Sequence, residues 1–216
     1  MRIIVVPVKS LSSAKSRLSP FLSPIERATL TLAMLEDVLD AVTALHGWEP
    51  WVVSPDEAVL EVALRRGVRP VEETRGPLSA AVRQVEEDAT ARGAEALAIL
   101  LGDTPLVTAE ALSAALHTLG PVVVAPSTDE GGTNLLLRRP PRAIGARFGT
   151  ESFRRHLEAA SLKELPAAVV RRPELAFDLD APDDILTVLS SDRRRRTLAV
   201  CRELDLEDRL RVLAEA

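Results

Sequence analysis

The chain has 216 residues, of which 46% are hydrophobic and 27% are charged, which is the balance of an ordinary globular protein with one sizeable core. Its net charge of −5 and the lack of a basic stripe argue against nucleic-acid binding. No apolar run reaches the ~18 residues that a membrane span needs. The first apolar run is too short for a signal peptide, and a single cysteine, Cys201, excludes an internal disulfide framework. We therefore expect a cytoplasmic enzyme or binding protein.

Strands and helices alternate through the first 120 residues. The β-branched run at residues 2–8 predicts a buried strand, and the Ser-, Lys- and Pro-rich residues 9–22 predict a loop. Ser23-Pro24-x-Glu26 then predicts the start of a helix, with Ser23 and Glu26 forming a capping box. Further strands are predicted between helices that end at glycines, at residues 50–55, 68–72 and 96–103. Such alternation predicts βαβ units and a parallel sheet.

After residue 120 the pattern changes. Two runs, "PVVVAPS" and "TNLLLRR", predict neighbouring strands with a glycine turn between them, and a helix follows at 151–160. "AAVVRR" and "LAFDLD" are then predicted as strands, before a helical tail at 189–216. Because no repeat or linker is visible, we expect one domain spanning 1–216. The arginine run 193–196 in the tail is interpreted as a solvated helix face.

Three aspartates follow predicted strands. Ligands of an open parallel sheet bind at the carboxyl ends of its strands, where Asp103, Asp178 and Asp180 are expected. Carboxylates from separate strands suit a magnesium ion shared with phosphates. The three histidines are far apart in sequence, so we expect no zinc site. Taken singly, Asp103 could be a turn former and Asp180 a helix N-cap.

The stretch D-E-G-G-T-N at residues 129–134 lies between two apolar runs and allows two interpretations. It could be a plain hairpin turn. It could instead be a surface where glycine amides lie bare and bind a small anion. Lys15 and Arg17 also allow two interpretations, because they could be solvated loop charges or could bind phosphate.

Several segments, taken together and in order, resemble one known family. They are "VPVKSLSSAKSRLS", "LGDTPLVT", "GGTNLLLRRPP", "FGTESFRRHLEAA" and "FDLDAPDDI". The chain resembles the phosphoenolpyruvate / 2-phospho-L-lactate guanylyltransferases of coenzyme F420 biosynthesis, from residue 4 to about residue 189. The resemblance implies a single Rossmann-like α/β nucleotidyltransferase domain with a mixed, mostly parallel central sheet flanked by helices.

The resemblance also implies roles for individual residues. Lys15, Arg17 and Asp103 would be catalytic, and Mg²⁺ would be held by Asp103 with Asp178 or Asp180. In the wider superfamily the second metal ligand stands four residues before a proline, which favours Asp178. The phospho-acid would be bound by Thr133, Gly149 and Ser152, with Gly132 and Asn134 beside them. GTP would lie near Pro7, Lys9, Ser54, Pro55, Gly76 and Leu78, with Pro77 between the last two.

The reaction implied is attack of the phosphate of a small phospho-acid on the α-phosphorus of GTP, with loss of pyrophosphate. Phosphoenolpyruvate is the expected acid, and 2-phospho-L-lactate and 3-phosphoglycerate remain open. The expected partners are small molecules, with neither nucleic acid nor membrane, and a homodimer is one allowed assembly. The alternatives are a sugar-phosphate or molybdopterin nucleotidyltransferase, whose glycine-rich first loop is missing here, and a non-catalytic nucleotide-binding protein.

Overall fold

The computed structural model describes residues 1–74, 76, 78–191 and 195–214. Among these residues seven strands form one sheet in the order β3-β2-β1-β4-β6-β5-β7. Only β6 runs antiparallel to its neighbours, β4 and β5, within the described sheet. The mixed, mostly parallel sheet expected from the sequence is therefore confirmed. The strands are β1 (Arg2–Pro7), β2 (Glu49–Ser54), β3 (Arg69–Glu72), β4 (Ala96–Leu100), β5 (Val122–Pro126), β6 (Thr133–Arg138) and β7 (Ala167–Val169).

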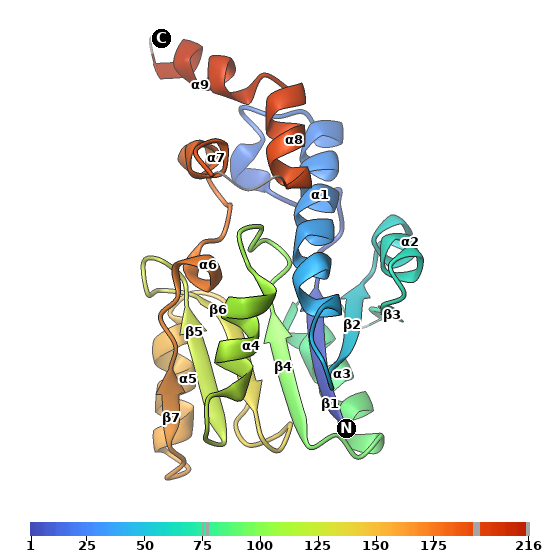
Figure 1. Ribbon diagram of the computed structural model, residues 1–216, viewed down its shortest axis with the longest axis vertical. Helices are drawn as coiled ribbons and strands as arrows, with labels where there is room; N and C mark the ends of the chain where they lie inside the picture. The colour runs from blue at the N-terminus through green and yellow to red at the C-terminus, as the bar shows by residue number, and fades with distance from the viewer. Residues whose placement is uncertain (75, 77, 192–194, 215–216) are drawn as a thin grey trace.

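Helices cover both faces of this sheet and give the domain three layers (Figure 1). One face packs against α1 (Pro24–Thr43), α2 (Glu57–Arg65), α4 (Ala109–His117) and the short α6 (Pro173–Ala176). The other face packs against α3 (Leu78–Ala91) and α5 (Ser152–Ser161). The central strands β1 and β4 are almost wholly buried, as their continuous apolar runs predict.

The first long helix begins where the sequence predicts. Ser23 and Glu26 form the capping box, with the Glu26 N–H donating to Ser23 Oγ at 3.3 Å and the Ser23 N–H donating to Glu26 Oε2 at 2.8 Å. Leu30, Met34 and Val38 are fully buried along one side of the helix. Capping and the apolar stripe together fix α1 against the sheet.

The tail helices lie beyond the carboxyl ends of the parallel strands, at the top of Figure 1. They are α7 (Pro182–Leu189), α8 (Arg196–Glu203) and α9 (Leu206–Ala214). Their apolar residues form a separate cluster with the first half of α1 and with Leu18 of the short helix η1 (Ser16–Leu18). The tail is thus packed onto the first loop of the chain.

One arginine of the tail differs from its expected role. The Arg195 guanidinium donates to the carbonyls of Leu106 and Val107, at 3.2 and 2.8 Å. Arg196 pairs with Asp40 at 2.6 Å. Arg195 therefore holds the tail against the turn before α4, which differs from the expected role. Arg196 is exposed at the start of α8, as a solvated helix face predicts, and Arg193 and Arg194 lie outside the described residues.

A second correction concerns "LAFDLD". The segment begins in α6 and continues without regular structure, so it is not a strand. Pro173 stands in the first turn of α6, where its fixed backbone angle favours a helix and its missing N–H costs nothing. The segment crosses the end of the sheet instead of joining it, and the Leu179 N–H donates to the Asp103 carbonyl at 3.0 Å. In the described part of the chain, no helix has the length and apolarity of a membrane span.

Candidate active site at the carboxyl edge of the sheet

A pocket of about 370 Å³ opens at the carboxyl ends of β1 and β4. The loop after β1 forms one wall, and the turn after β4 and the start of α3 form others. Gly102 in the β4 turn lies so close to β1 that a Cβ there would be 3.0 Å from Val8 Cγ2 and 3.2 Å from the Pro7 carbonyl. Of the residues predicted to bind nucleotide or act on it, these line the pocket: Pro7, Lys9, Lys15, Arg17, Leu78, Asp103 and Asp180.

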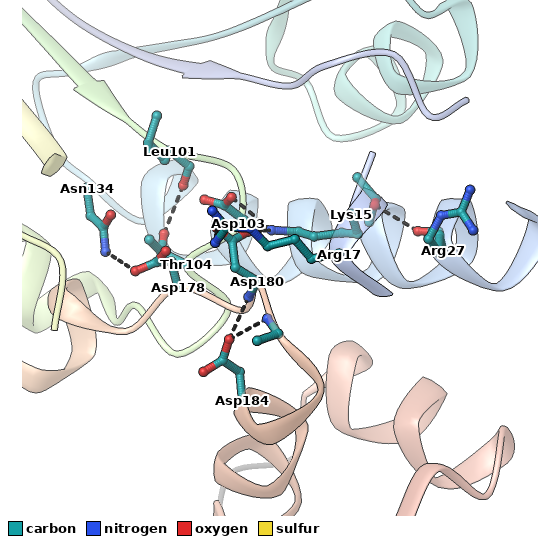
Figure 2. A network of polar contacts seen from close by, with 12 residues as sticks. Lys15, Arg17, Arg27, Leu101, Asp103, Thr104, Asn134, Asp178, Asp180 and Asp184 are labelled. Carbon is teal, nitrogen blue, oxygen red and sulfur yellow. Dashed lines mark hydrogen bonds and ion pairs between the residues drawn. The ribbon is translucent and has the colours of Figure 1, made fainter. Parts of the chain in front are cut away.

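Lys15 is the central cation of this pocket. Its Nζ donates to Asp103 Oδ2 at 2.9 Å and to Asp180 Oδ1 at 2.8 Å, and its side chain is only 7% exposed (Figure 2). Burial alone would lower the pKa of the Lys15 ammonium, but the two carboxylates outweigh burial and raise it above the usual value. Lys15 is therefore a fixed positive charge in the lining of the pocket.

The acidic residues have unequal surroundings. Asp103 Oδ1 is buried and has no hydrogen-bond partner. Asp178 Oδ1 accepts a hydrogen bond from Asn134 Nδ2 at 3.1 Å. Burial, together with the negative charges of Asp103 and Asp180, raises the pKa of the Asp178 carboxyl to about 6, although the Asn134 hydrogen bond acts against the rise. Asp103 therefore keeps one carboxylate oxygen without a partner although Lys15 binds the other, and Asp178 has no ion pair of its own in the described chain.

Asp180 differs from Asp178 in its contacts. Burial would raise the pKa of the Asp180 carboxyl, yet the adjacent Lys15 ammonium lowers it below its usual value, with help from Arg17 at 3.7 Å. Asp180 is not the N-cap of α7; Ala181 holds that position. Instead Asp184 Oδ2 accepts the N–H groups of Asp180 and Ala181, at 2.8 and 2.7 Å, and so fixes the segment (Figure 2).

One positioning residue was missed from the sequence, and another makes contacts that the sequence did not predict. Asn134, predicted beside the phospho-acid, is buried and donates to the carbonyls of Leu175 and Ala176 as well as to Asp178. Arg27 is buried on α1 and donates to the carbonyls of Ala14 and Leu22, at 3.3 and 2.8 Å, which holds the loop that carries Lys15. Arg27 falls on the apolar stripe of α1, and that position could have identified it.

The glycine turn is closed by its own contacts. Gly131 N–H donates to Asp129 Oδ1 at 3.0 Å, and Gly132 N–H donates to Ser127 Oγ at 2.7 Å. The Glu130 N–H donates to the Ser127 carbonyl at 2.9 Å. These contacts favour the hairpin-turn interpretation over the anion-binding one, because the N–H groups of Glu130, Gly131 and Gly132 are already used within the turn.

Thr133 and the start of α5 form a second polar group. Thr133 Oγ1 lies 3.0 Å from Nδ1 of His156, and the Arg147 N–H donates to His156 Nε2 at 2.8 Å. Gly149 has a φ of +108°, and a Cβ there would meet no atom within 4 Å, so the space beside it is open. The Ser152 side chain is buried at the first turn of α5. Thr133 and Asn134 are adjacent, so β6 links this group to the acidic residues.

The remaining predicted nucleotide contacts lie away from the pocket lining. Ser54 is fully buried, and its Oγ accepts the Asp56 N–H at 3.1 Å. Pro55 and Gly76 are exposed, and Gly76 has a φ of +100°. Pro77 lies outside the described residues. Leu78 is the one member of the predicted guanine and ribose region that lines the pocket within the described chain.

Comparisons with known proteins agree on one family. A family profile described as guanylyl transferase CofC like matches residues 1–210. The chain is 43% identical over 187 residues to a phosphoenolpyruvate guanylyltransferase of Sphaerobacter thermophilus, covering 85% of this chain and 90% of the relative. It is 36% identical over 207 residues to a 3-phospho-D-glycerate guanylyltransferase of Phenylobacterium zucineum, covering 93% and 95%. A 2-phospho-L-lactate guanylyltransferase of Methanothermobacter thermautotrophicus is 37% identical over 184 residues, covering 84% and 81%.

The fold has solved counterparts. A structure assigned to the nucleotide-diphospho-sugar transferases, from Desulfovibrio desulfuricans G20, superposes with a TM-score of 0.77 at 22% identity. The match covers 97% of this chain and 99% of that one. At this level of identity the likeness concerns the fold alone.

Proposed function

The chain belongs to the CofC-like guanylyl transferase family, and on that premise we propose that it transfers GMP from GTP to phosphoenolpyruvate and releases pyrophosphate. The family membership confirms the resemblance seen in the sequence motifs. The enzyme is a nucleotidyltransferase that carries out guanylyl transfer. The identity of the acid, the metal and the role of each residue are our proposals. The observation that carries them is the meeting of Lys15, Asp103 and Asp180 at the pocket.

In the proposed reaction a phosphate oxygen of the acid attacks the α-phosphorus of GTP. A new P–O bond forms, the bond from the α-phosphorus to the bridging oxygen breaks, and pyrophosphate leaves with that electron pair. The attacking phosphate is already ionised near neutral pH, so no general base is needed. Lys15 and Arg17 neutralise charge on the triphosphate, and the chain contributes mainly orientation and charge.

The acidic residues fit a magnesium ion. The buried, unpartnered Oδ1 of Asp103 and the Asp178 carboxyl are hard oxygen ligands, and the two carboxylates are near enough for their charges to interact. Asp180 already accepts a hydrogen bond from the Lys15 ammonium. Within the described ranges no three acidic, histidine or cysteine side chains are arranged to hold a metal ion. We therefore propose Asp103 and Asp178 as the protein ligands, with phosphate oxygens completing the shell. The ion would neutralise the negative charge that the phosphates bring together.

We propose phosphoenolpyruvate as the acid because the relatives at 41–43% identity are named for it. The other two acids remain alternatives, since relatives at 36% and 37% are named for 3-phospho-D-glycerate and 2-phospho-L-lactate. The product with phosphoenolpyruvate would be enolpyruvoyl-2-diphospho-5′-guanosine, a step of coenzyme F420 biosynthesis. We place the enzyme in the cytoplasm, and a homodimer can be tested by its size in solution.

Pyrophosphate release tests the proposal. The purified chain is supplied with MgCl₂, GTP and each of the three acids in turn, and we expect the highest kcat/KM with phosphoenolpyruvate. Reactions without acid, without Mg²⁺ and with ATP in place of GTP serve as controls. Release of pyrophosphate with a sugar phosphate but with none of the three acids would contradict the proposed function.

A further inference from the structure

His156 of α5 is completely buried, and both of its ring nitrogens have partners. Its ring also packs edge-on against Phe148, with the ring centroids 5.3 Å apart. The ring therefore connects three segments: β6 through Thr133, the loop before α5 through Arg147, and α5 itself. Nothing in the proposed chemistry yet uses this histidine.

The hydrogen-bond partners fix the position of the ring proton. A backbone N–H can only donate, so the Arg147 N–H requires a bare, accepting Nε2. A neutral imidazole then carries its proton on Nδ1, and that proton is donated to Thr133 Oγ1 at 3.0 Å. Burial and the charges of Arg138, Arg155 and Arg147 lower the pKa of His156 to about 3, which agrees with a neutral ring.

The consequence falls on the Thr133 hydroxyl. Because its oxygen accepts from His156, its own proton points away from the ring and is available to a different acceptor. No second partner for this hydroxyl is present in the described part of the chain. The loop that His156 holds through Arg147 leads directly to Gly149, beside which there is open space, and to Ser152.

We propose that His156 is a positioning residue that turns the Thr133 hydroxyl into a hydrogen-bond donor for an anionic oxygen of the phospho-acid. The inference rests on the proposed function, because it assigns the acid to the Thr133 side of the site. His156 does not touch the substrate; it sets the direction of the Thr133 proton and holds the loop at Gly149. Without it, the threonine hydroxyl could present its lone pairs to the anion and repel it.

Two substitutions test the roles of the His156 ring nitrogens Nδ1 and Nε2 separately. The amide nitrogen of His156→Asn falls near Nδ1 and retains a donor to Thr133, whereas the amide oxygen of His156→Gln falls near Nε2 and retains only an acceptor for Arg147. We expect His156→Gln to raise KM for phosphoenolpyruvate on the order of tenfold or more, the effect of a lost hydrogen bond to a charged group. We expect His156→Asn to stay closer to wild type, and KM for GTP to change little in either variant.

A double-mutant cycle tests whether the effect passes through Thr133. In a Thr133→Val background, His156→Gln should add little to KM for the acid, because the hydroxyl that it orients is gone. The matched control is His46→Gln, which makes the same change at an exposed histidine. Equal effects of His156→Gln with and without Thr133 would overturn the positioning role in favour of a purely structural one.

Two readouts do not depend on turnover. Long-range ¹H–¹⁵N NMR spectra should show His156 protonated at Nδ1 and bare at Nε2, and the opposite tautomer would overturn the inference. Phosphoenolpyruvate binding is measured by calorimetry with GTP and Mg²⁺ omitted, and His156→Gln should bind it more weakly than wild type. Binding of the acid without any guanylyl transfer would contradict the proposed function alone. A wild-type chain that binds none of the three phospho-acids would overturn both.

Discussion

Asp103 is placed where a small chemical change should have a large effect. One carboxylate oxygen accepts a hydrogen bond from the Lys15 ammonium, and the other oxygen is buried without a hydrogen-bond partner. We expect Asp103→Asn to lower kcat for guanylyl transfer by at least a hundredfold, since the amide retains the shape but loses the charge that would hold magnesium and Lys15. Steady-state pyrophosphate release at saturating GTP and MgCl₂ measures this loss.

The control for this change is Asp183→Asn, on the exposed side of the first turn of α7. It removes the same charge a few residues from Asp180 without touching the pocket, and it should turn over at close to the wild-type rate. An Asp103→Asn enzyme within about tenfold of wild type, a change of under ~1.4 kcal/mol in the barrier, would refute the proposed role of Asp103.

Thr133 provides a second test at the level of single residues. Thr133→Val preserves the β-branched shape but deletes the hydroxyl that contacts His156. We expect KM for phosphoenolpyruvate to rise by about tenfold to a hundredfold, while KM for GTP stays nearly fixed, because a hydrogen bond to a charged group contributes about 1.5–3 kcal/mol. If the variant weakened GTP and the acid equally, the separation of the site into two halves would be wrong.

At the level of elements, the joint between α1 and α8 depends on a buried carboxylate. Asp37 accepts the backbone N–H groups of Arg196 and Thr197, both at 2.9 Å, and the Thr197 hydroxyl at 2.7 Å. It therefore caps α8 from the middle of another helix. We expect Asp37→Ala to lower the free energy of unfolding by about 2–4 kcal/mol, because two buried donors of Thr197 and the half-buried N–H of Arg196 lose a charged acceptor.

Urea unfolding measures this loss, with Asp40→Ala as the control. Asp40 lies one turn further along α1 and pairs with Arg66 and Arg196, but its side chain is 48% exposed. An exposed pair contributes at most about 1 kcal/mol, so Asp40→Ala should unfold at nearly the wild-type urea concentration. Equal destabilisation by the two variants would show that Asp37 does not anchor the tail as described.

Some elements could be predicted from the sequence and others could not. The β1 and β4 runs and the Ser23 capping box are local signals, and they give the observed strands and the start of α1. "LAFDLD" alternates like a strand, but its backbone carbonyls are taken by Asn134, 41 and 42 residues away in the sequence. No local pattern reports such a contact.

The candidate site divides in a similar way. Residues that follow strands, such as Asp103, could be placed at the sheet edge by topology alone. The contacts of Arg27, Asn134 and Asp184 could not, because each is made to a backbone carbonyl or N–H group, and the pattern of side chains does not identify which backbone group a side chain will bind. A charged residue on the apolar stripe of a helix is the one signal available for Arg27 and for Asp37, and it indicates burial without naming the partner.

At the level of the whole molecule, buried charge links the layers on the α3 and α5 side of the sheet. Arg138 of β6 is fully buried and pairs with Glu86 of α3 at 3.0 Å. Burial lowers the pKa of His156, and the positive charges of Arg138, Arg155 and Arg147 lower it further, so the ring stays neutral. A ring that stays neutral when folded and is protonated when unfolded connects the stability of the entire fold to pH.

The sign of this effect follows from the two pKa values. The pKa of His156 is about 3 in the folded chain and 6.5 in its ordinary state, so it is lowered by folding. Its contribution to stability is complete above pH 6.5 and is lost as the pH falls toward 3. Between pH 7 and pH 5 the unfolded chain binds a proton that the folded chain does not, and the free energy of unfolding should fall by about 2 kcal/mol from this group.

The substitution His156→Asn removes the titrating group, so the free energy of unfolding of this variant should fall by about 2 kcal/mol less than that of wild type over the same interval. Urea unfolding at pH 7 and pH 5 measures both, with His46→Gln as the control substitution at an exposed histidine. If wild type and His156→Asn lost equal stability between these two pH values, His156 would not be the buried neutral group that joins β6 to α5.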